Sequence, residues 1–334
     1  MASRFRSVGV IGGGAWGTAL ASLCAGNDVD TRIWALEDET AWAINNTHTN
    51  KPYLPSVPLP KALTATTSMA EMADRDAYLV VAPAQYARQT LVSLKEFAAT
   101  DAPLALCCKG IEQRSGMLMT EVLAEVWPQA RPAVLSGPSF ARDVAMGLPT
   151  AVTLAAADAE LGRRWMETVS APNFRPYLSG DLVGAEIGGA VKNVLAIAAG
   201  AVDGRGLGES ARAAIIARGF AEFQRLGVAL GAKAETMAGL SGLGDLILTA
   251  TSSQSRNMSL GQELGRGRSI KDVLGERRSV TEGVATAPAV IAMAAKAGVE
   301  MPVCAAVADL VSGAKGLDEI IAALMARPLK EELR

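Results

Sequence analysis

The sequence predicts an α/β protein in which a doubly wound parallel sheet is followed by an all-helical domain. Two observations support this fold class. Up to about residue 180, short apolar runs alternate with segments of helical periodicity, which is typical of a parallel sheet covered by helices on both faces. From residue 181 onward only helical periods and glycine-rich turns remain. We therefore expect a sheet domain over residues 1–180 and a helical domain over residues 181–334.

The first expected strand, residues 7–11, runs directly into a glycine motif and then into an expected helix at residues 18–25. In this setting one glycine makes a tight turn, one lets the backbone approach a pyrophosphate, and one lets the helix pack closely on the strand. The amino end of the helix offers free N–H groups to phosphates. The order of elements predicts a Rossmann-type site for a nicotinamide dinucleotide, contacted by Gly12, Gly14, Ala15, Trp16 and Gly17.

A second expected strand, residues 31–36, ends at Glu37, where the Rossmann pattern places an acid on the ribose hydroxyls. Two more acids follow, and no Arg or Lys occurs until Lys51. A 2′-phosphate would meet like charge here, whereas a ribose hydroxyl could donate to a carboxylate. We expect NAD or NADP as cofactor, with NAD preferred. The alternative is that the acids form a solvated turn and that Arg32 or Lys51 reaches the phosphate.

The remaining strands and helices continue the alternation. Apolar runs predict five further strands, at residues 76–82, 104–108, 133–136, 151–155 and 174–178. Helical periodicity predicts helices at residues 85–97, 159–169, 211–230, 286–297 and 302–312. Because ligands of parallel sheets bind beyond the carboxyl ends of the strands, Lys109 and the turn at residues 136–139 should lie on the same edge as the glycine motif.

Lys192 is the most informative single residue, because it interrupts an otherwise apolar helix of small side chains. Burying an unpaired ammonium group is costly, and burial generally lowers the pKa of a lysine toward the range useful for proton transfer. The alternative is a side chain whose stem follows the helix while its head reaches solvent. His48 is the only histidine and lies in a polar segment between the second and third expected strands. Proton transfer is therefore expected to rely on lysine.

Composition predicts a cytoplasmic, mid-sized enzyme. The chain has 334 residues, of which 50% are hydrophobic and 4% aromatic, so its core should be closely packed aliphatic side chains. The net charge of −2 does not favour binding to nucleic acid or to an anionic membrane. The four cysteines show no metal-ligand spacing and are expected to be reduced. Lys192 and Asn193 interrupt the longest apolar stretch, so we expect no membrane span and no metal.

These motifs resemble those of the bacterial type of NAD(P)-dependent sn-glycerol-3-phosphate dehydrogenase along nearly the full chain. Besides the glycine motif, the resemblance rests on Tyr53-Leu54-Pro55, Lys109-Gly110, Ser136-Gly137-Pro138-Ser139-Phe140-Ala141, Gly189-Ala190-Val191-Lys192-Asn193-Val194, Gly242-Leu243-Gly244-Asp245-Leu246, Gln254-Ser255-Arg256-Asn257, Thr281-Glu282-Gly283 and Met301-Pro302. It implies a Rossmann domain followed by an all-α domain like that of 6-phosphogluconate dehydrogenase. It also implies a cytoplasmic homodimer that interconverts dihydroxyacetone phosphate and sn-glycerol 3-phosphate and supplies glycerophospholipid synthesis.

The resemblance implies a role for each matching residue. Lys192 matches the proton acceptor in glycerol phosphate oxidation, and hence the donor in the reverse reaction, while Lys109 matches a lysine that touches both cofactor and substrate. The polar residues that hold these lysines are matched by Asn193, Asp245 and Thr249. Together with both lysines and Asp245, the substrate contacts are matched by Gly137, Ser139, Ser255, Arg256 and Asn257. Further cofactor contacts, besides Lys109, are matched by Ala141, Arg256, Val280 and Glu282.

Simpler explanations and other functions remain open at this point. Taken alone, Arg256 could be a surface cation and Asp245 a charge at a helix N-terminus. The chain also departs from the family at Arg205, usually apolar, and at Ser210, usually asparagine, which questions local packing and one substrate-side hydrogen bond. Another lysine-dependent hydroxyacid or ketoacid dehydrogenase is disfavoured by Arg256. A non-catalytic dinucleotide-binding sensor, or a Rossmann methyltransferase, is disfavoured by the lysines and Asp245.

Overall fold

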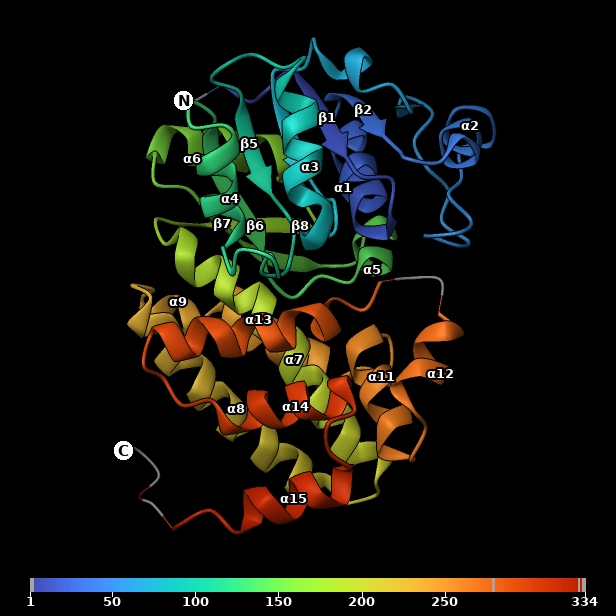
Figure 1. Cartoon of the computed structure of the whole chain (residues 1–334). Helices are drawn as coiled ribbons and strands as arrows, with labels where there is room; N and C mark the ends of the chain where they lie inside the picture. Colours follow the sequence, from blue (N-terminus) through green and yellow to red (C-terminus); the bar gives the residue numbers. More distant parts are fainter. Residues whose placement is uncertain (1–2, 278–279, 330, 332–334) are drawn as a thin grey trace. The chain divides into compact units, whose positions relative to one another are not determined.

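The observed architecture confirms the predicted fold class (Figure 1). The structure is a computed structural model that describes residues 3–277, 280–329 and 331. An eight-stranded, mainly parallel sheet with covering helices comes first, and after its last strand the described residues form only helices and turns.

The chain forms two compact units. The first comprises Met1–Gly189 with Gly231–Asp245, and the second comprises Ala190–Leu230 with Leu246–Arg334. The first unit therefore holds the whole sheet and two short helical segments that follow much later in the sequence. We keep residue 180/181 as the proposed domain boundary, because the last strand ends at Ser179.

The sheet has the strand order β3-β2-β1-β4-β5-β6-β7-β8. Strands β1 and β4 lie in its middle and are almost fully buried, as expected for parallel strands covered on both faces. The strands are β1 Ser7–Ile11, β2 Asp30–Trp34, β3 Thr64–Thr66, β4 Ala77–Val80, β5 Pro103–Leu106, β6 Arg131–Ser136, β7 Thr150–Ala155 and β8 Phe174–Ser179.

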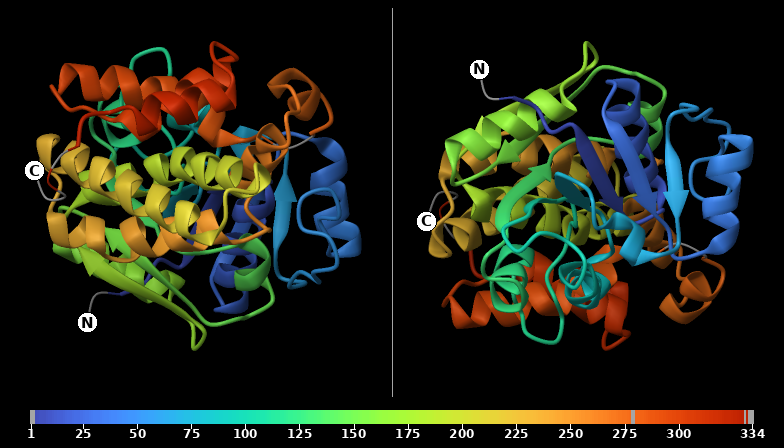
Figure 2. Two further views of the ribbon diagram at one scale, coloured as in Figure 1. Left: turned by 90° about the horizontal axis from the view of Figure 1, so that it is seen from below. Right: turned by 90° about the horizontal axis from the view of Figure 1, so that it is seen from above.

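Helices cover both faces of this sheet. One core cluster joins even-numbered residues of β1, such as Val8, to residues of α1 (Ala15–Gly26), α5 (Ala141–Ala145) and α6 (Ala159–Val169). A second joins Ile11 and β4 to residues of α3 (Ala84–Lys95) and α4 (Met119–Val126). Figure 2 shows α2 (Asp38–Thr47), in blue, beside the β2–β3 edge of the sheet. Side chains on the two faces of the inner strands thus enter two separate cores.

Several expected elements have different bounds, and some were missed. The sequence did not predict β3, because it is only three residues long and two of them are threonines. Strand β2 ends at Trp34, before the predicted end, and the segment around His48 mostly belongs to α2. His48 ends that helix in a left-handed conformation with φ 49°. The short η1 helix (Met69–Met72) was also missed.

The expectation of a wholly parallel sheet is wrong at one pair, since β7 runs antiparallel to β6. The connection between them contains only α5, whose five residues rise about 7 Å. Strand β6 has six residues and spans about 20 Å, so this helix is much shorter than the strand beside it, unlike the helix of a usual parallel crossover. Strand β8 then pairs parallel to β7, after the longer crossover through α6.

Strand β8 forms a free edge of the sheet. The N–H groups of Thr150 and Ala156 donate to the carbonyls of Asn173 and Ser179 at 2.9 Å, so the odd-numbered residues of β8 face β7. Successive residues of a strand point their N–H and C=O groups to opposite sides. The backbone of Pro176 therefore faces away from β7. Proline has no N–H, so the middle of this edge lacks a hydrogen-bond donor.

The second unit is built of helices around α7 (Leu182–Gly204), which begins in the first unit. By length and composition α7 could cross a membrane, contrary to the expectation from sequence, with a mean hydropathy of 1.5. However, 83% of that stretch is buried in the protein, as in the core helix of a globular domain. The helices that follow are α8 Glu209–Ala229, α9 Ala234–Ala238, η2 Leu240–Gly244, α10 Asp245–Thr251, α11 Arg256–Gly265, α12 Ile270–Gly275, α13 Glu282–Lys296, α14 Pro302–Ser312 and α15 Leu317–Met325.

Glycines let α7 and α11 cross at close range. A methyl group added to Gly200 of α7 would overlap the carbonyl oxygen of Met258, and one added to Gly261 of α11 would overlap that of Ile197. Small residues at such a crossing bring the two backbones together, and this fixes the start of α11 relative to α7. The helices predicted at residues 159–169 and 302–312 have the predicted bounds.

Candidate active site

The glycine motif has the geometry expected for a tight turn, for the approach of a pyrophosphate and for close packing of the helix. Gly12 has φ 129°, and a methyl group there would come within 3.1 Å of the carbonyl carbon of Val81, so the turn needs glycine. A methyl group at Gly17 would overlap the carbonyl oxygen of Gly12, so α1 packs directly on the turn. At Gly14 the same test finds no atom within 4 Å. The turn is thus tightly packed at Gly12 and Gly17, whereas at Gly14 it leaves space for a phosphate to approach.

The start of α1 supplies the other half of this cradle. Ala15 and Trp16 are its first two residues, so their N–H groups belong to the helix end that has no internal acceptors. Helix α1 has no acidic residue in its first turn, which leaves the positive end of its dipole available to an anion. The residues present fit the pyrophosphate of a dinucleotide.

Glu37 lies just beyond β2 and caps the start of α2 with extended backbone. Its carboxylate accepts a hydrogen bond from the Tyr53 hydroxyl, with 2.9 Å between oxygens. This hydrogen bond raises the pKa of Tyr53. Arg32 points elsewhere, because its guanidinium donates to the carbonyl of Glu71 at 2.6 Å and lies 4.0 Å from Asp74. Of the two bases that could serve a 2′-phosphate, Arg32 is thus already engaged.

Lys109 is held at the carboxyl end of the sheet, as predicted. Its ammonium group donates to Asp245 at 2.9 Å and to the carbonyl oxygen of Gly137 at 3.0 Å. The Asp245 side chain is only 1% exposed, so this pair lies in a shielded environment where charge interactions are strong. Asp245 is also the first residue of α10, so it serves both as a helix N-terminal charge and as the partner of Lys109.

Glycines at the start of α7 let Lys109 and η2 pack closely against this helix. A methyl group at Gly189 would lie 2.9 Å from the Ser136 hydroxyl and 3.3 Å from Cγ of Lys109. One at Gly188 would overlap the carbonyl oxygen of Ser241. The small residues around Lys192 in the sequence therefore make room for the Lys109 side chain and for η2, which leads into Asp245.

The turn after β6 contains three of the predicted contact residues. Gly137 has φ 150°, and a methyl group there would come within 2.9 Å of Cα of Val152, so only glycine fits. The Ser139 hydroxyl donates to the Gly137 carbonyl at 3.0 Å, and Ala141 begins α5. The Gly137 carbonyl thus receives bonds from both Lys109 and Ser139, which fixes the end of the Lys109 side chain.

Lys192 is buried, at 7% exposure, and its ammonium group donates to the Thr249 hydroxyl at 3.0 Å. Thr249 is also buried. The alternative in which the head of Lys192 reaches solvent is therefore wrong. Thr249 lies four residues after Asp245 on α10, so these two residues lie on the same face of that helix.

The start of α11 forms a second polar cluster within the helical unit. Asn257 donates to the side-chain oxygen of Asn193 at 2.9 Å and accepts from the N–H of Gly283 at 3.0 Å. Ser255 caps the helix by accepting from the N–H of Met258 at 3.2 Å. Because Asn257 uses both ends of its amide group, it links the starts of α11 and α13 to α7.

Arg256 is the first residue of α11, and the residue as a whole is exposed to solvent. Protein atoms crowd its guanidinium closely enough that desolvation lowers its pKa, while the charge of Glu282 opposes that effect. Glu282 begins α13, and Val280, just before it, is exposed. The charges of Arg256 and Glu282 are thus close enough to interact.

The two departures from the family pattern have local explanations. Arg205 forms an ion pair with Asp318 of α15, at 2.9 and 3.1 Å, and both side chains are exposed. Ser210, in the first turn of α8, is exposed. Neither position disturbs the surroundings of Lys192 described above.

Sequence reasoning did not name Asn50, and it gave Tyr53 no role beyond its place in the Tyr53-Leu54-Pro55 motif. Asn50 is fully buried and donates to the Gly13 carbonyl at 2.8 Å and to the Thr18 hydroxyl at 2.7 Å. Tyr53 binds Glu37, as described. Their signal was the turn-forming run Asn50-Lys51-Pro52-Tyr53, but nothing in the sequence says which distant residues such a turn contacts.

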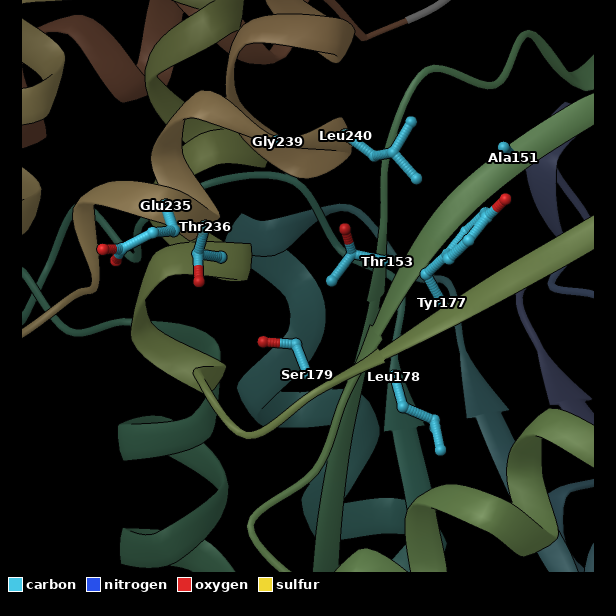
Figure 3. Close-up of a pocket in the computed structure, with 9 residues that line it drawn as sticks. All are labelled: Ala151, Thr153, Tyr177, Leu178, Ser179, Glu235, Thr236, Gly239 and Leu240. Atoms are coloured by element: carbon cyan, nitrogen blue, oxygen red, sulfur yellow. The ribbon is translucent and has the colours of Figure 1, made fainter.

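A cavity of about 540 Å³ lies over β7 and β8, beside α9 and η2 (Figure 3). Thr153 and Tyr177 of the sheet line it, as do Glu235 of α9 and Leu240 of η2. None of the predicted site residues lines it, and none of the nine lining residues shown is basic. This cavity offers no positive charge to a phosphorylated substrate.

The glycine cradle, the acid beyond β2 and the two shielded lysines define a class of protein, namely a nicotinamide-dinucleotide dehydrogenase with a Rossmann-type sheet and a helical part. Two family profiles narrow this class. The N-terminal profile of NAD-dependent glycerol-3-phosphate dehydrogenase matches residues 7–162, and the C-terminal profile matches residues 181–322. The chain belongs to the NAD-dependent glycerol-3-phosphate dehydrogenase family.

Similar proteins agree with this assignment. Glycerol-3-phosphate dehydrogenase [NAD(P)+] of Maricaulis maris is 55% identical over 330 residues, with 99% of each chain covered. The protein of the same name from Caulobacter vibrioides is 54% identical and covers 98% of this chain and 99% of its own. A crystal structure of glycerol-3-phosphate dehydrogenase from Coxiella burnetii superposes with a TM-score of 0.93 at 35% identity, covering 96% of this chain and 99% of that one.

Proposed function

We propose that this protein reduces dihydroxyacetone phosphate to sn-glycerol 3-phosphate with NADH or NADPH and catalyses the reverse oxidation. The observation that carries the proposal is Lys192, an ammonium buried in an apolar helix and held by Thr249 at 3.0 Å. When hydride reaches the ketone carbon, negative charge develops on its oxygen. An ammonium in this position stabilises that charge and donates the proton, and in the reverse direction the amine accepts it.

The bound dinucleotide supplies the hydride in reduction and accepts it in oxidation. Gly12, Gly14 and Gly17, with Ala15 and Trp16, would hold its pyrophosphate, and Glu37 would accept hydrogen bonds from its ribose. The open space at Gly14 supports this assignment, because the backbone there can approach a phosphate without obstruction. Ala141, Val280 and Glu282 complete the proposed cofactor contacts.

The remaining polar residues are proposed to bind and orient the substrate. Lys109, whose position is fixed by Asp245 and the Gly137 carbonyl, would donate to a substrate oxygen. Arg256 would pair with the substrate phosphate, since its planar fork matches two phosphate oxygens and it begins a helix whose N-terminus attracts anions. The same helix start carries Asn257. The other proposed contacts are Gly137, Ser139, Ser255 and Asn193.

We place this reaction in the cytoplasm, in a homodimer that supplies sn-glycerol 3-phosphate for glycerophospholipid synthesis. These points are what the resemblance to the family implies. Analytical ultracentrifugation tests the dimer directly, and a single monomeric species at working concentrations would rule it out.

The decisive experiment follows the loss of NADH absorbance when dihydroxyacetone phosphate is added. Dihydroxyacetone without phosphate and a panel of 2-ketoacids serve as comparisons. We expect turnover with the phosphorylated ketone only. Turnover with a ketoacid but not with dihydroxyacetone phosphate would favour the alternative hydroxyacid dehydrogenase, and dinucleotide binding without any turnover would favour a sensor.

We further predict that NADH is preferred to NADPH. Glu37 and the two acids after it present like charge to a 2′-phosphate, and Arg32 is bound to Glu71 and close to Asp74. Comparing kcat/KM for the two reduced cofactors with dihydroxyacetone phosphate measures the preference. A ratio favouring NADPH by about tenfold, or about 1.4 kcal/mol, would show that another base, such as Lys51, receives the phosphate.

A further inference from the structure

A single turn, residues 50–54, connects the glycine motif to the acid beyond β2. At its base, Asn50 donates to the Gly13 carbonyl and the Thr18 hydroxyl, at 2.8 and 2.7 Å. Its tip reaches Glu37 through the Tyr53 hydroxyl at 2.9 Å. The two groups that would hold the pyrophosphate and the ribose are thus joined by side chains of one short segment.

The backbone of this turn is fixed, so the Tyr53 ring starts from a defined position. The N–H groups of Tyr53 and Leu54 both donate to the Asn50 carbonyl, at 3.3 and 2.7 Å. Asn50 and Leu54 are buried, at 0% and 2% exposure, whereas the Tyr53 side chain extends outward and is partly exposed. A tyrosine anchored in this way can restrict the motion of a partner that is itself exposed.

Glu37 is such a partner. It is exposed, and its side chain makes no hydrogen bond to the start of α2, the helix that it caps. Without Tyr53 the carboxylate would sample several rotamers, and a ligand would have to restrict them at a cost in entropy. With Tyr53 bound to one oxygen, the second oxygen keeps its capacity to accept hydrogen bonds.

We propose that Tyr53 is a positioning residue for cofactor specificity: it holds the Glu37 carboxylate so that this group accepts the ribose hydroxyls of NAD(H) and repels the 2′-phosphate of NADP(H). This inference rests on the proposed function, because it takes Glu37 as the ribose contact. Tyr53 acts through Glu37, so removing its hydroxyl should matter only while Glu37 carries its charge.

The test compares Tyr53→Phe, Glu37→Gln and the double variant by direct binding of NADH and NADPH, followed by fluorescence without substrate. Phenylalanine keeps the ring and removes only the hydroxyl. We expect Tyr53→Phe to weaken NADH binding about three- to tenfold, the range of one ordinary hydrogen bond at a partly exposed site, and to leave NADPH binding unchanged or tighter. In the Glu37→Gln background the same change should have no further effect on NADH binding.

Tyr177→Phe is the matched control, since Tyr177 is a half-exposed tyrosine of β8 far from Glu37 in the sequence, and it should bind both cofactors like the wild type. An equal loss for NADH and NADPH would mean that Tyr53 only supports the local fold, and would overturn the proposal. So would unchanged NADH binding, or a loss of the same size in the Glu37→Gln background.

Failure of the proposed function gives a different result. A wild-type protein that binds NADH but does not reduce dihydroxyacetone phosphate would refute the proposed reaction, while the binding comparison would still decide the role of Tyr53. Thermal unfolding of each variant shows whether the fold is retained.

Discussion

At the scale of single residues, the surroundings of Lys192 determine what its ammonium group can do. The side chain lies in an apolar helix, yet its charge is neither unpaired nor in solvent, because Thr249 accepts its hydrogen bond. The hydroxyl of Thr249 orients this ammonium group. Lys109 is likewise held by a buried side chain, since its ammonium group pairs with Asp245.

We predict that Lys192→Met keeps dinucleotide binding but loses turnover by at least about 10²-fold, the usual scale for removing a general acid–base group. Methionine preserves the length and apolar stem of the side chain. Initial rates with dihydroxyacetone phosphate and NADH binding by fluorescence measure the two effects separately. Lys296→Met, on the exposed end of α13, is the control and should have wild-type rates. Near-normal turnover in Lys192→Met would remove this lysine from the mechanism.

Arg256 leads to a prediction about binding rather than chemistry. Losing a charge-assisted pair with the substrate phosphate should cost about 1.5–3 kcal/mol, so Arg256→Ala should raise the substrate KM more than it weakens dinucleotide binding. The control is Arg266→Ala, which removes an exposed arginine just after the other end of α11. If the wild type handled sn-glycerol and its phosphate equally well, the assignment of Arg256 to the phosphate would be wrong.

At the scale of elements, the sequence predicted the helices and strands that local residue patterns determine. It missed the features that depend on contacts between distant residues. Apolar β-branched runs revealed β1, and helical periodicity placed α6 and α14 with the observed bounds. Strand β3 was missed because three mostly polar residues carry no periodicity; pairing with β2 makes them a strand. The direction of β7 has no signal in its own residues and is seen only in its pairing with β6 and β8. For the same reason, the motifs contained both Glu37 and Tyr53 but did not show that the two side chains are hydrogen-bonded.

The crossing of α7 and α11 leads to a stability prediction. Gly200→Ala should lower the free energy of unfolding by about 1–3 kcal/mol, because its methyl group would overlap the Met258 carbonyl and overpacking forces the helices apart. Gly275→Ala, where the added methyl group meets nothing within 4 Å, is the matched control. It should be neutral or stabilise by up to about 1 kcal/mol through helix propensity. Equal denaturation midpoints for the two variants would contradict this account of the crossing.

At the scale of the whole molecule, two buried glutamates each hold the start of a helix. Glu186 accepts from the N–H and the hydroxyl of Thr120 in α4, at 2.8 and 2.5 Å. Glu222 accepts from the N–H groups of Val303 and Cys304 in α14, at 2.7 and 3.2 Å. Burial raises the pKa of each to about 7, although the hydrogen bonds oppose this effect. Folding of the protein is therefore coupled to proton binding by these two carboxyl groups.

The sign of this linkage gives a pH prediction. The pKa of Glu222 is about 7 in the folded protein against an ordinary value of 4.5, so the folded state binds the extra proton between these values. The contribution of Glu222 to stability is full below the lower value and is lost as the pH rises through about 7, by up to about 3 kcal/mol. Chemical denaturation across this pH range should show that the free energy of unfolding falls less steeply with rising pH in Glu222→Gln than in the wild type. Glu319→Gln, on α15, should follow the wild type; a wild-type slope in Glu222→Gln would refute the prediction.

Pro176 bears on how copies of this chain behave in a crowded solution. An exposed strand edge is a template on which another chain can add a strand, and such addition starts aggregation. At the centre of the β8 edge the donor that an incoming strand would need is missing, because proline occupies that position. The charged neighbour Arg175 is also exposed and adds repulsion between like copies. The edge that ends the sheet therefore also protects the protein against sheet growth, and a dimer of this chain should be built from surfaces other than β8.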